Sequence, residues 1–173
     1  MHYPPAWFDV LGDLAAKYGT KDPRRSSVPR TADLMEALAS WYQQRCSKIW
    51  QKAVPTILIG WSMGGGVVIE SAARLLRAQN VEIRGVATIA SPALPVQKQS
   101  VQLIRSAGAE LRVLVGAADE SFDAVRHSAR LASWADVVPE VFPGEGHGVK
   151  SAFARLAPWV EERLEVHSIP TRS

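Results

Sequence analysis

The sequence contains little cysteine, little net charge and no long apolar run. Its 173 residues include one cysteine, Cys46, which excludes an internal disulfide and is typical of a reducing compartment. There is no run of 18 apolar residues, and no basic segment followed by an apolar core. The sequence therefore predicts neither a membrane span nor a signal peptide, and we expect a cytoplasmic protein; a segment upstream of Met1 would leave room for a targeting signal.

The charge and the spacing of potential metal ligands argue against a nucleic-acid-binding protein and against a metalloprotein. The net charge is +3, and the basic residues of the segment 20–30 have no interleaved aromatic residues and no nucleic-acid motif, so we interpret this segment as a solvated loop and expect no nucleic-acid partner. The spacing of cysteine and histidine matches no metal site. With 47% hydrophobic residues, the chain is long enough for one packed domain.

Residues 56–69 contain an apolar run, a serine framed by glycines, and a helix-like run. This pattern predicts a strand, a sharp turn at Ser62 and a helix. A serine in such a strained turn leaves no room for a bulky Cβ two residues to either side, which explains Gly60 and Gly64. The helix directs its free N–H groups to the same place. Ser62 is therefore the candidate nucleophile, and the backbone N–H of Met63 is a candidate oxyanion donor.

Two later segments supply the partners that a nucleophilic serine needs. Residues 111–119 read as a buried strand ending in Asp119, and residues 143–148 place His147 in a glycine-rich loop. The chain order Ser, Asp, His is that of the α/β-hydrolase triad and differs from the orders of chymotrypsin-like and subtilisin-like proteases. We predict that His147 takes the Ser62 proton while Asp119 holds the imidazole in the required tautomer, with no cofactor or metal.

Other residues compete for the acid and for the acyl site. Asp123 and Asp136 are alternatives to Asp119, but Asp123 falls in a helical pattern, where a first-turn carboxylate favours the helix dipole. Trp61, beside the nucleophile, either lines the acyl site or packs against a neighbouring strand. Both interpretations of Trp61 stay open.

The other histidines are less suited to act as the base. His127 lies in that same helical pattern, and His2 and His167 lie near the ends of the chain. His147 has glycines on both sides, which allows a loop to bring the imidazole over Ser62. Glu145, two residues earlier, is interpreted as a solvated loop charge, with tuning of the histidine as the alternative.

From residue 56 onward, strands and helices alternate. The predicted strands are 56–61, 84–90, 111–117 and 137–142, and the predicted helices are 65–78, 98–106, 121–134 and 150–165. Strands separated by helices indicate a parallel sheet with right-handed crossovers. We therefore expect an α/β fold, a three-layer sandwich around a mostly parallel sheet. Pro139 inside the last strand removes a backbone donor and indicates an edge.

Before residue 56 the pattern changes, and no strand is predicted. Residues 7–18 have helical spacing, and Thr31 is a plausible N-cap of a further helix. We expect one domain over residues 1–173, with an atypical segment at 1–30 and a disordered tail at 167–173.

These motifs resemble the α/β-hydrolase superfamily from about Thr31 to the C-terminus. The sequence GWSMG at 60–64 and the strand ending in GAADE at 116–120 are most similar to dienelactone-hydrolase-like enzymes. They are also similar to the hydrolase-like family that includes a testis-expressed protein and a subunit of the NSL histone acetyltransferase complex. The resemblance implies that Ser62 is the nucleophile, Asp119 the acid and His147 the base.

The resemblance also implies features that this sequence does not display. Four strands precede the elbow in the superfamily, and the loop after the third supplies a second oxyanion donor. We expect either an N-terminally shortened chain or an unusually small sheet, and favour the first. An unpaired apolar elbow strand would be an aggregation-prone edge, suited to a protein partner or to self-association.

Two functions from different classes follow. The first is a serine hydrolase that cleaves a carboxylic ester, thioester or related acyl bond of a small-molecule substrate through an acyl-enzyme. The alternative is a catalytically weak or inactive hydrolase-like module that binds other proteins. The identity of the substrate, and the choice between hydrolysis and acyl transfer, are not encoded in a recognisable pattern.

Overall fold

The structure, a computed structural model, describes residues 55–78, 81–93 and 96–164. The expectations for the segment 1–30, for the helix after Thr31, for Cys46, His2 and His167, and for the tail 167–173 lie outside the described residues.

In the described residues, four parallel strands form one sheet in the order β1-β2-β3-β4. The strands are β1 (Pro55–Trp61), β2 (Glu82–Ile89), β3 (Glu110–Gly116) and β4 (Glu140–Phe142). The helices are α3 (Met63–Ala78), α4 (Lys98–Ser106), α5 (Ala124–Ala135), which follows the 3₁₀ turn η1 (Ser121–Asp123), and α6 (Lys150–Leu164). Each strand pairs with the next strand along the chain, so the expected α/β fold with a parallel sheet is confirmed.

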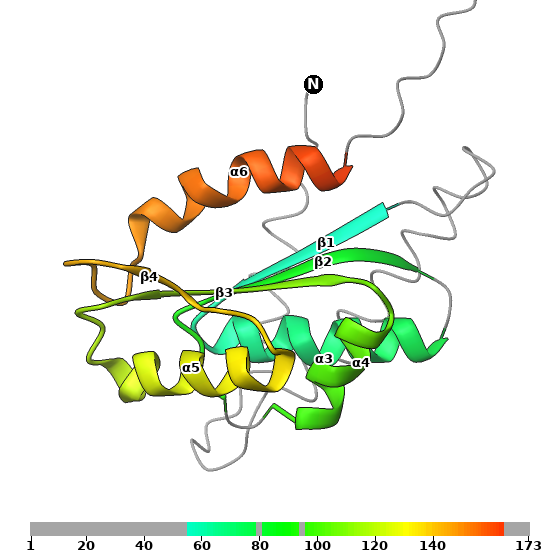
Figure 1. Cartoon of the computed structure of the whole chain (residues 1–173), viewed down its shortest axis with the longest axis horizontal. Helices are drawn as coiled ribbons and strands as arrows, with labels where there is room; N and C mark the ends of the chain where they lie inside the picture. The colour runs from blue at the N-terminus through cyan, green and yellow to red at the C-terminus, as the bar shows by residue number, and fades with distance from the viewer. Residues whose placement is uncertain (1–54, 79–80, 94–95, 165–173) are drawn as a thin grey trace, which may run out of the picture.

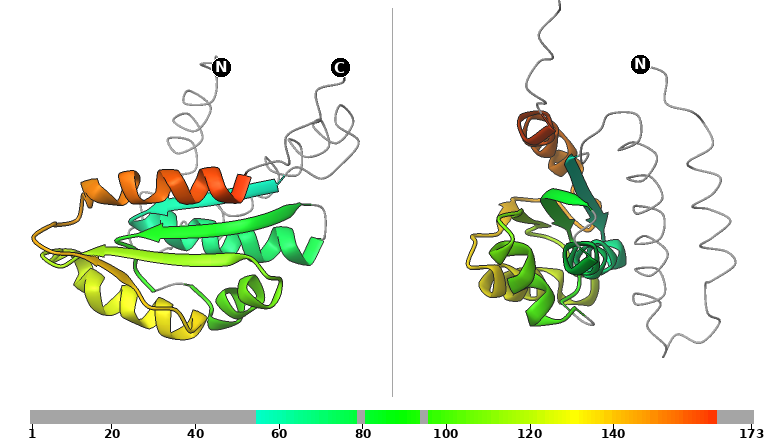
Figure 2. Two further views of the ribbon diagram at one scale, coloured as in Figure 1. Left: turned by 45° about the horizontal axis from the view of Figure 1, so that its top comes forward. Right: turned by 90° about the vertical axis from the view of Figure 1, so that its right-hand side faces the viewer.

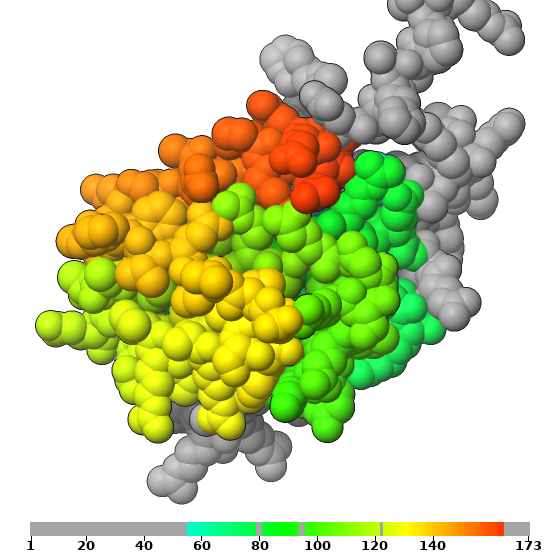
Figure 3. All heavy atoms as spheres, in the orientation of Figure 1, coloured from blue at the N-terminus to red at the C-terminus, as the bar shows by residue number. Residues whose placement is uncertain are grey.

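Helices cover both faces of the sheet. Helix α6 lies over one face, and α3, α4 and α5 lie over the other (Figures 1 and 2). Successive residues of a strand point to opposite faces, so Val86 and Val113 enter the core beneath α3, α4 and α5, whereas Ala87 and Leu114 enter the core beneath α6. In Figure 3, the orange atoms of α6 lie directly against the green atoms of the strands.

Helix α6 approaches the sheet closely at one glycine. A Cβ at Gly85 would lie 2.5 Å from the ring of Trp159, so the glycine makes room for the indole. The guanidinium of Arg112 lies 5.6 Å from the centroid of the same ring and forms an ion pair with Glu140. This pair ties the short strand β4, and therefore the loop that follows it, to β3.

The predicted helix 121–134 and the predicted strand 137–142 both begin later in the structure than expected. Asp123 has a φ of 56°, in the left-handed region, so α5 begins at Ala124 after a 3₁₀ turn instead of running from residue 121. The last strand is shorter than the predicted 137–142, and Pro139 precedes it. The prediction that Pro139 lies inside the strand is wrong, although β4 does end the described sheet.

Strand β1 ends the described sheet on the other side, where it pairs with β2. The expected unpaired edge beside β1 depends on residues 1–54, outside the described part of the chain. That expectation therefore stays a prediction.

Candidate active site

Ser62 lies at the junction of β1 and α3, with a φ of 54°. A Cβ at Gly60 would lie 2.2 Å from the carbonyl oxygen of Gly64, so glycine is required on the strand side of the turn, as the motif predicts. Among the described residues, a Cβ at Gly64 would meet nothing within 4 Å, whereas one at Gly65 would lie 1.7 Å from Ser91 Oγ. Within the described part of the chain, the steric requirement therefore falls on Gly65 and not on the predicted Gly64.

This difference gives a direct test by stability. We expect Gly65→Ala to lower the free energy of unfolding by about 1–3 kcal/mol, because the new methyl group overlaps the buried Ser91 side chain. Gly64→Ala should be neutral or stabilising by up to about 1 kcal/mol, since alanine favours the helix. Chemical denaturation of both variants measures the difference, and equal destabilisation would contradict it.

The start of α3 offers a backbone donor beside Ser62. The N–H of Ser62 donates to the carbonyl of Ile89 at 2.8 Å, which fixes the turn against β2. Met63 is the first residue of α3, so its N–H has no acceptor within the helix. No acidic residue lies in the first turn of α3 to offset the positive end of the helix dipole. The Met63 N–H therefore stays the candidate oxyanion donor.

The structure brings Ser62, His147 and Asp119 into one hydrogen-bonded chain. His147 Nε2 lies 3.0 Å from Ser62 Oγ, and His147 Nδ1 lies 2.9 Å from Asp119 Oδ2. The Asp119 side chain is fully buried, and its other oxygen accepts the backbone N–H of Ser121 at 2.9 Å. With both oxygens engaged, the carboxylate is fixed in orientation, and it favours the tautomer in which Nδ1 carries the proton and Nε2 faces the hydroxyl.

The competing carboxylates lie at the two ends of α5. Asp123 is exposed and lies 3.7 Å from Arg126, while Asp136 is exposed and hydrogen-bonds Arg105 at 2.8 Å. His127 lies within α5, as its sequence position predicts.

The loop that carries His147 is anchored to the end of β3. Gly116 allows this approach, since a Cβ there would lie 2.2 Å from the carbonyl oxygen of Glu145, and that carbonyl accepts the N–H of Ala118 at 2.9 Å. The Glu145 carboxylate accepts the backbone N–H of Ser151 at 3.2 Å and also bonds its hydroxyl. Glu145, interpreted from the sequence as a solvated charge, therefore holds the loop to the first turn of α6.

Trp61 makes a contact that the sequence does not reveal. Its indole Nε1 donates to the carbonyl oxygen of His147 at 2.8 Å, and the indole and imidazole centroids lie 5.1 Å apart at an interplanar angle of 47°. Of the two interpretations of Trp61, neither includes this bond. The bond joins residues 86 positions apart, so no local pattern could have predicted it.

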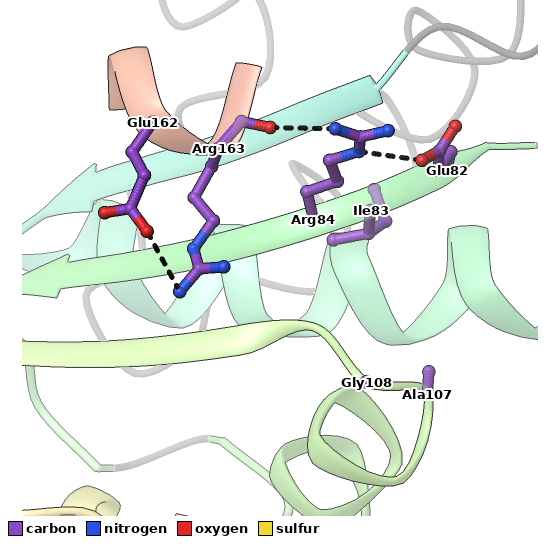
Figure 4. A pocket seen from close by; sticks show the side chains of 7 residues that line it. All are labelled: Glu82, Ile83, Arg84, Ala107, Gly108, Glu162 and Arg163. Carbon is purple, nitrogen blue, oxygen red and sulfur yellow. Dashed lines mark hydrogen bonds and ion pairs between the residues drawn. The ribbon is translucent and has the colours of Figure 1, made fainter. Parts of the chain in front are cut away.

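A cavity of about 400 Å³ lies beside the first residues of β2 (Figure 4), whereas Ser62 follows the last residue of β1. It is formed by the start of β2, the end of α4 and the end of α6. Its arginine Arg84 donates to Glu82 at 2.7 Å and to the carbonyl oxygen of Arg163 at 3.2 Å. Because Ser62 follows the carboxyl end of β1, this cavity is not positioned to hold a substrate for the candidate nucleophile.

Metal and membrane features can be stated for the described ranges. Within residues 55–78, 81–93 and 96–164, no three His, Cys, Asp or Glu side chains gather where they could hold a metal ion. No helix of these ranges is long and apolar enough to cross a membrane.

A parallel sheet covered by helices, with a serine at the strand-to-helix elbow, defines an α/β-hydrolase. Residues 10–142 match the thioesterase domain family, and the chain belongs to this family. The matched range includes Ser62 and Asp119 and ends before His147. The superfamily expected from the elbow is thus confirmed, and the matching family differs from the dienelactone-hydrolase-like and NSL-subunit families to which the elbow is similar.

Solved structures give the same fold. A carboxylesterase of the thaumarchaeon Nitrososphaera gargenis is 13% identical with a TM-score of 0.55, over 77% of this chain and 72% of that one. A predicted CIB-like hydrolase from Thermoplasma acidophilum is 22% identical with a TM-score of 0.52, over 73% and 60%. Human thioesterase 2 is 14% identical with a TM-score of 0.50, over 80% and 84%. No curated protein matches the chain by sequence.

Proposed function

We propose that the chain is a serine hydrolase that cleaves the thioester or ester of a small acyl compound through an acyl-enzyme on Ser62. The observation that carries this proposal is the chain of hydrogen bonds from Ser62 through His147 to the buried carboxylate of Asp119, at 3.0 and 2.9 Å. Membership of the thioesterase domain family supports an acyl bond as the target.

The reaction begins with proton transfer from the Ser62 hydroxyl to His147 Nε2 as the oxygen attacks the acyl carbonyl carbon. Asp119 stabilises the imidazolium that forms. His147 then returns the proton to the departing thiol or alcohol, which leaves the acyl group esterified to Ser62. Water, deprotonated by His147, attacks this ester and releases the carboxylic acid and the free serine.

The negative charge that develops on the carbonyl oxygen is stabilised at the start of α3. The Met63 N–H points to that end of the helix, and one such donor is typically worth about 3 kcal/mol of transition-state stabilisation. The second donor expected from the superfamily would come from a loop before residue 55, outside the described residues.

Between the two acyl bonds, a thioester is the better substrate for this arrangement. A thiol ionises far more readily than an alcohol, so it departs with less help from the proton on His147. We therefore expect a thioester to release its thiol faster than an ester of the same acyl group releases its alcohol.

Labelling with a fluorophosphonate tests the proposal. We expect one covalent adduct, located on Ser62 by peptide mapping, because only an activated serine reacts. A chain that is denatured before the reagent is added should form no adduct. Ser91→Ala is the matched control, since Ser91 is a buried serine next to the elbow and should not affect labelling. An unlabelled chain would favour the alternative of a hydrolase-like interaction module, and an adduct on another serine would show that Ser62 is not the nucleophile.

A further inference from the structure

We infer that Trp61 is a positioning residue that holds the His147 loop in reach of Ser62. This inference rests on the proposed function of the same site. It starts from the hydrogen bond between the indole Nε1 of Trp61 and the carbonyl oxygen of His147, 2.8 Å long, and from the contact between the two rings.

The loop needs a support near Ser62 because the anchors described above lie at the end of β3 and, through Glu145, at the first turn of α6. The N–H groups of Ala117 and Ala118 at the end of β3 hold the carbonyls of Phe142 and Glu145, each at 2.9 Å. Ser62 follows β1, two strands away from β3, a separation of about 10 Å. His147 must therefore extend across the end of β2, and Trp61 meets it from the side of the nucleophile.

The position of Trp61 in β1 explains why this residue can make the contact. Along β1, Leu58 and Gly60 are buried, whereas Ile59 and Trp61 are exposed on the opposite face. Ile57, on the same face as Trp61, packs into the core beneath α6. Trp61 thus projects on the α6 side of the sheet, where the loop from β4 to α6 arrives.

Burial does not account for a tryptophan at this position. The residue is 51% exposed, so much of its apolar area stays in contact with water. What tryptophan supplies here, and phenylalanine or leucine cannot, is an N–H at the far edge of a rigid ring. The bond restrains the backbone of the loop, and it therefore increases the fraction of time that the imidazole spends beside Ser62.

A positioning role and an acyl-lining role give different kinetics. His147 acts in formation and in hydrolysis of the acyl-enzyme, so loosening it should lower kcat by the same factor for every acyl group and leave KM unchanged. A side chain that contacts the acyl group should instead change KM and the preference for acyl length.

The variant Trp61→Phe separates these roles because it keeps an aromatic ring and removes the donor. We expect kcat to fall about tenfold for both acetyl and octanoyl thioesters, with KM unchanged. Trp134→Phe, which removes an indole from α5, is the control and should keep the wild-type kcat. An unchanged kcat in Trp61→Phe, or a changed KM that depends on acyl length, would overturn the inference.

Hydrogen exchange gives a second readout that needs no turnover. In Trp61→Phe, amides of residues 144–149 should exchange about tenfold faster, while those of β3 keep their wild-type rate, because only the loop is loosened. Equal exchange in the loop of the variant and of the wild type would also overturn the inference. If Ser62 is not labelled by fluorophosphonate, the proposed function fails, and the exchange experiment still decides whether Trp61 holds the loop.

Discussion

Replacing Ser62 by alanine is expected to lower kcat for thioester hydrolysis about 10⁶-fold. The variant has no hydroxyl to attack the carbonyl, while His147 and Asp119 keep their mutual hydrogen bond at 2.9 Å. Binding of a non-hydrolysable acyl analogue should be unchanged, since the loss affects the transition state. Thiol release measures turnover, and circular dichroism checks the fold.

Ser62→Gly is the control for backbone strain. At a φ of 54° an alanine keeps the strain of the left-handed region, whereas glycine does not. Both variants should be equally inactive, and the glycine variant should be more stable than the alanine variant by up to about 1 kcal/mol. Turnover above about one per cent of wild type in either variant would show that another group is the nucleophile.

Asp119→Asn should lower kcat about 10⁴-fold with the fold intact. An asparagine amide facing Nδ1 would favour the tautomer in which Nε2 carries the proton, and that nitrogen could no longer accept the Ser62 proton. The asparagine oxygen can still accept the Ser121 N–H, which preserves the local structure. Turnover and thermal unfolding, measured on the same preparation, separate the two effects.

Asp123→Asn is the matched control for this substitution. Asp123 lies four residues further along the chain, is exposed, and pairs with Arg126 at 3.7 Å. We expect less than a twofold change in kcat, since an exposed pair contributes little. A larger loss in Asp123→Asn than in Asp119→Asn would identify Asp119 as the wrong carboxylate.

Much of the fold can be predicted from apolar patterns. The run at 111–117 predicts β3 (Glu110–Gly116) within one residue, because a buried parallel strand is apolar on both faces. The predicted helix 98–106 coincides with α4 (Lys98–Ser106). The proximity of the candidate residues also follows from the pattern. The carboxyl ends of parallel strands meet at one edge of a sheet, and Ser62, Asp119 and His147 each follow a strand.

The remainder depends on contacts between distant segments. The steric need for Gly65 instead of Gly64 arises from Ser91 beyond β2, and nothing in the glycine-rich turn itself distinguishes the two. The bond from Trp61 to the His147 carbonyl likewise requires that β1 and the loop after β4, which are far apart in the sequence, are both in place. The late start of α5 reflects the left-handed backbone of Asp123, which helical periodicity does not detect.

Because the four strands of the described residues pair in chain order, this part of the sheet can form by stepwise addition of local strand-helix units from β1 to β4. The bond between Ser62 and His147 spans 85 positions and cannot close until β4 and its following loop have docked. During synthesis, a nascent chain that has folded only as far as α5 would display the elbow without its base. Under the proposed function, such an unfinished chain would not be acylated, and turnover would begin only once the loop after β4 has docked.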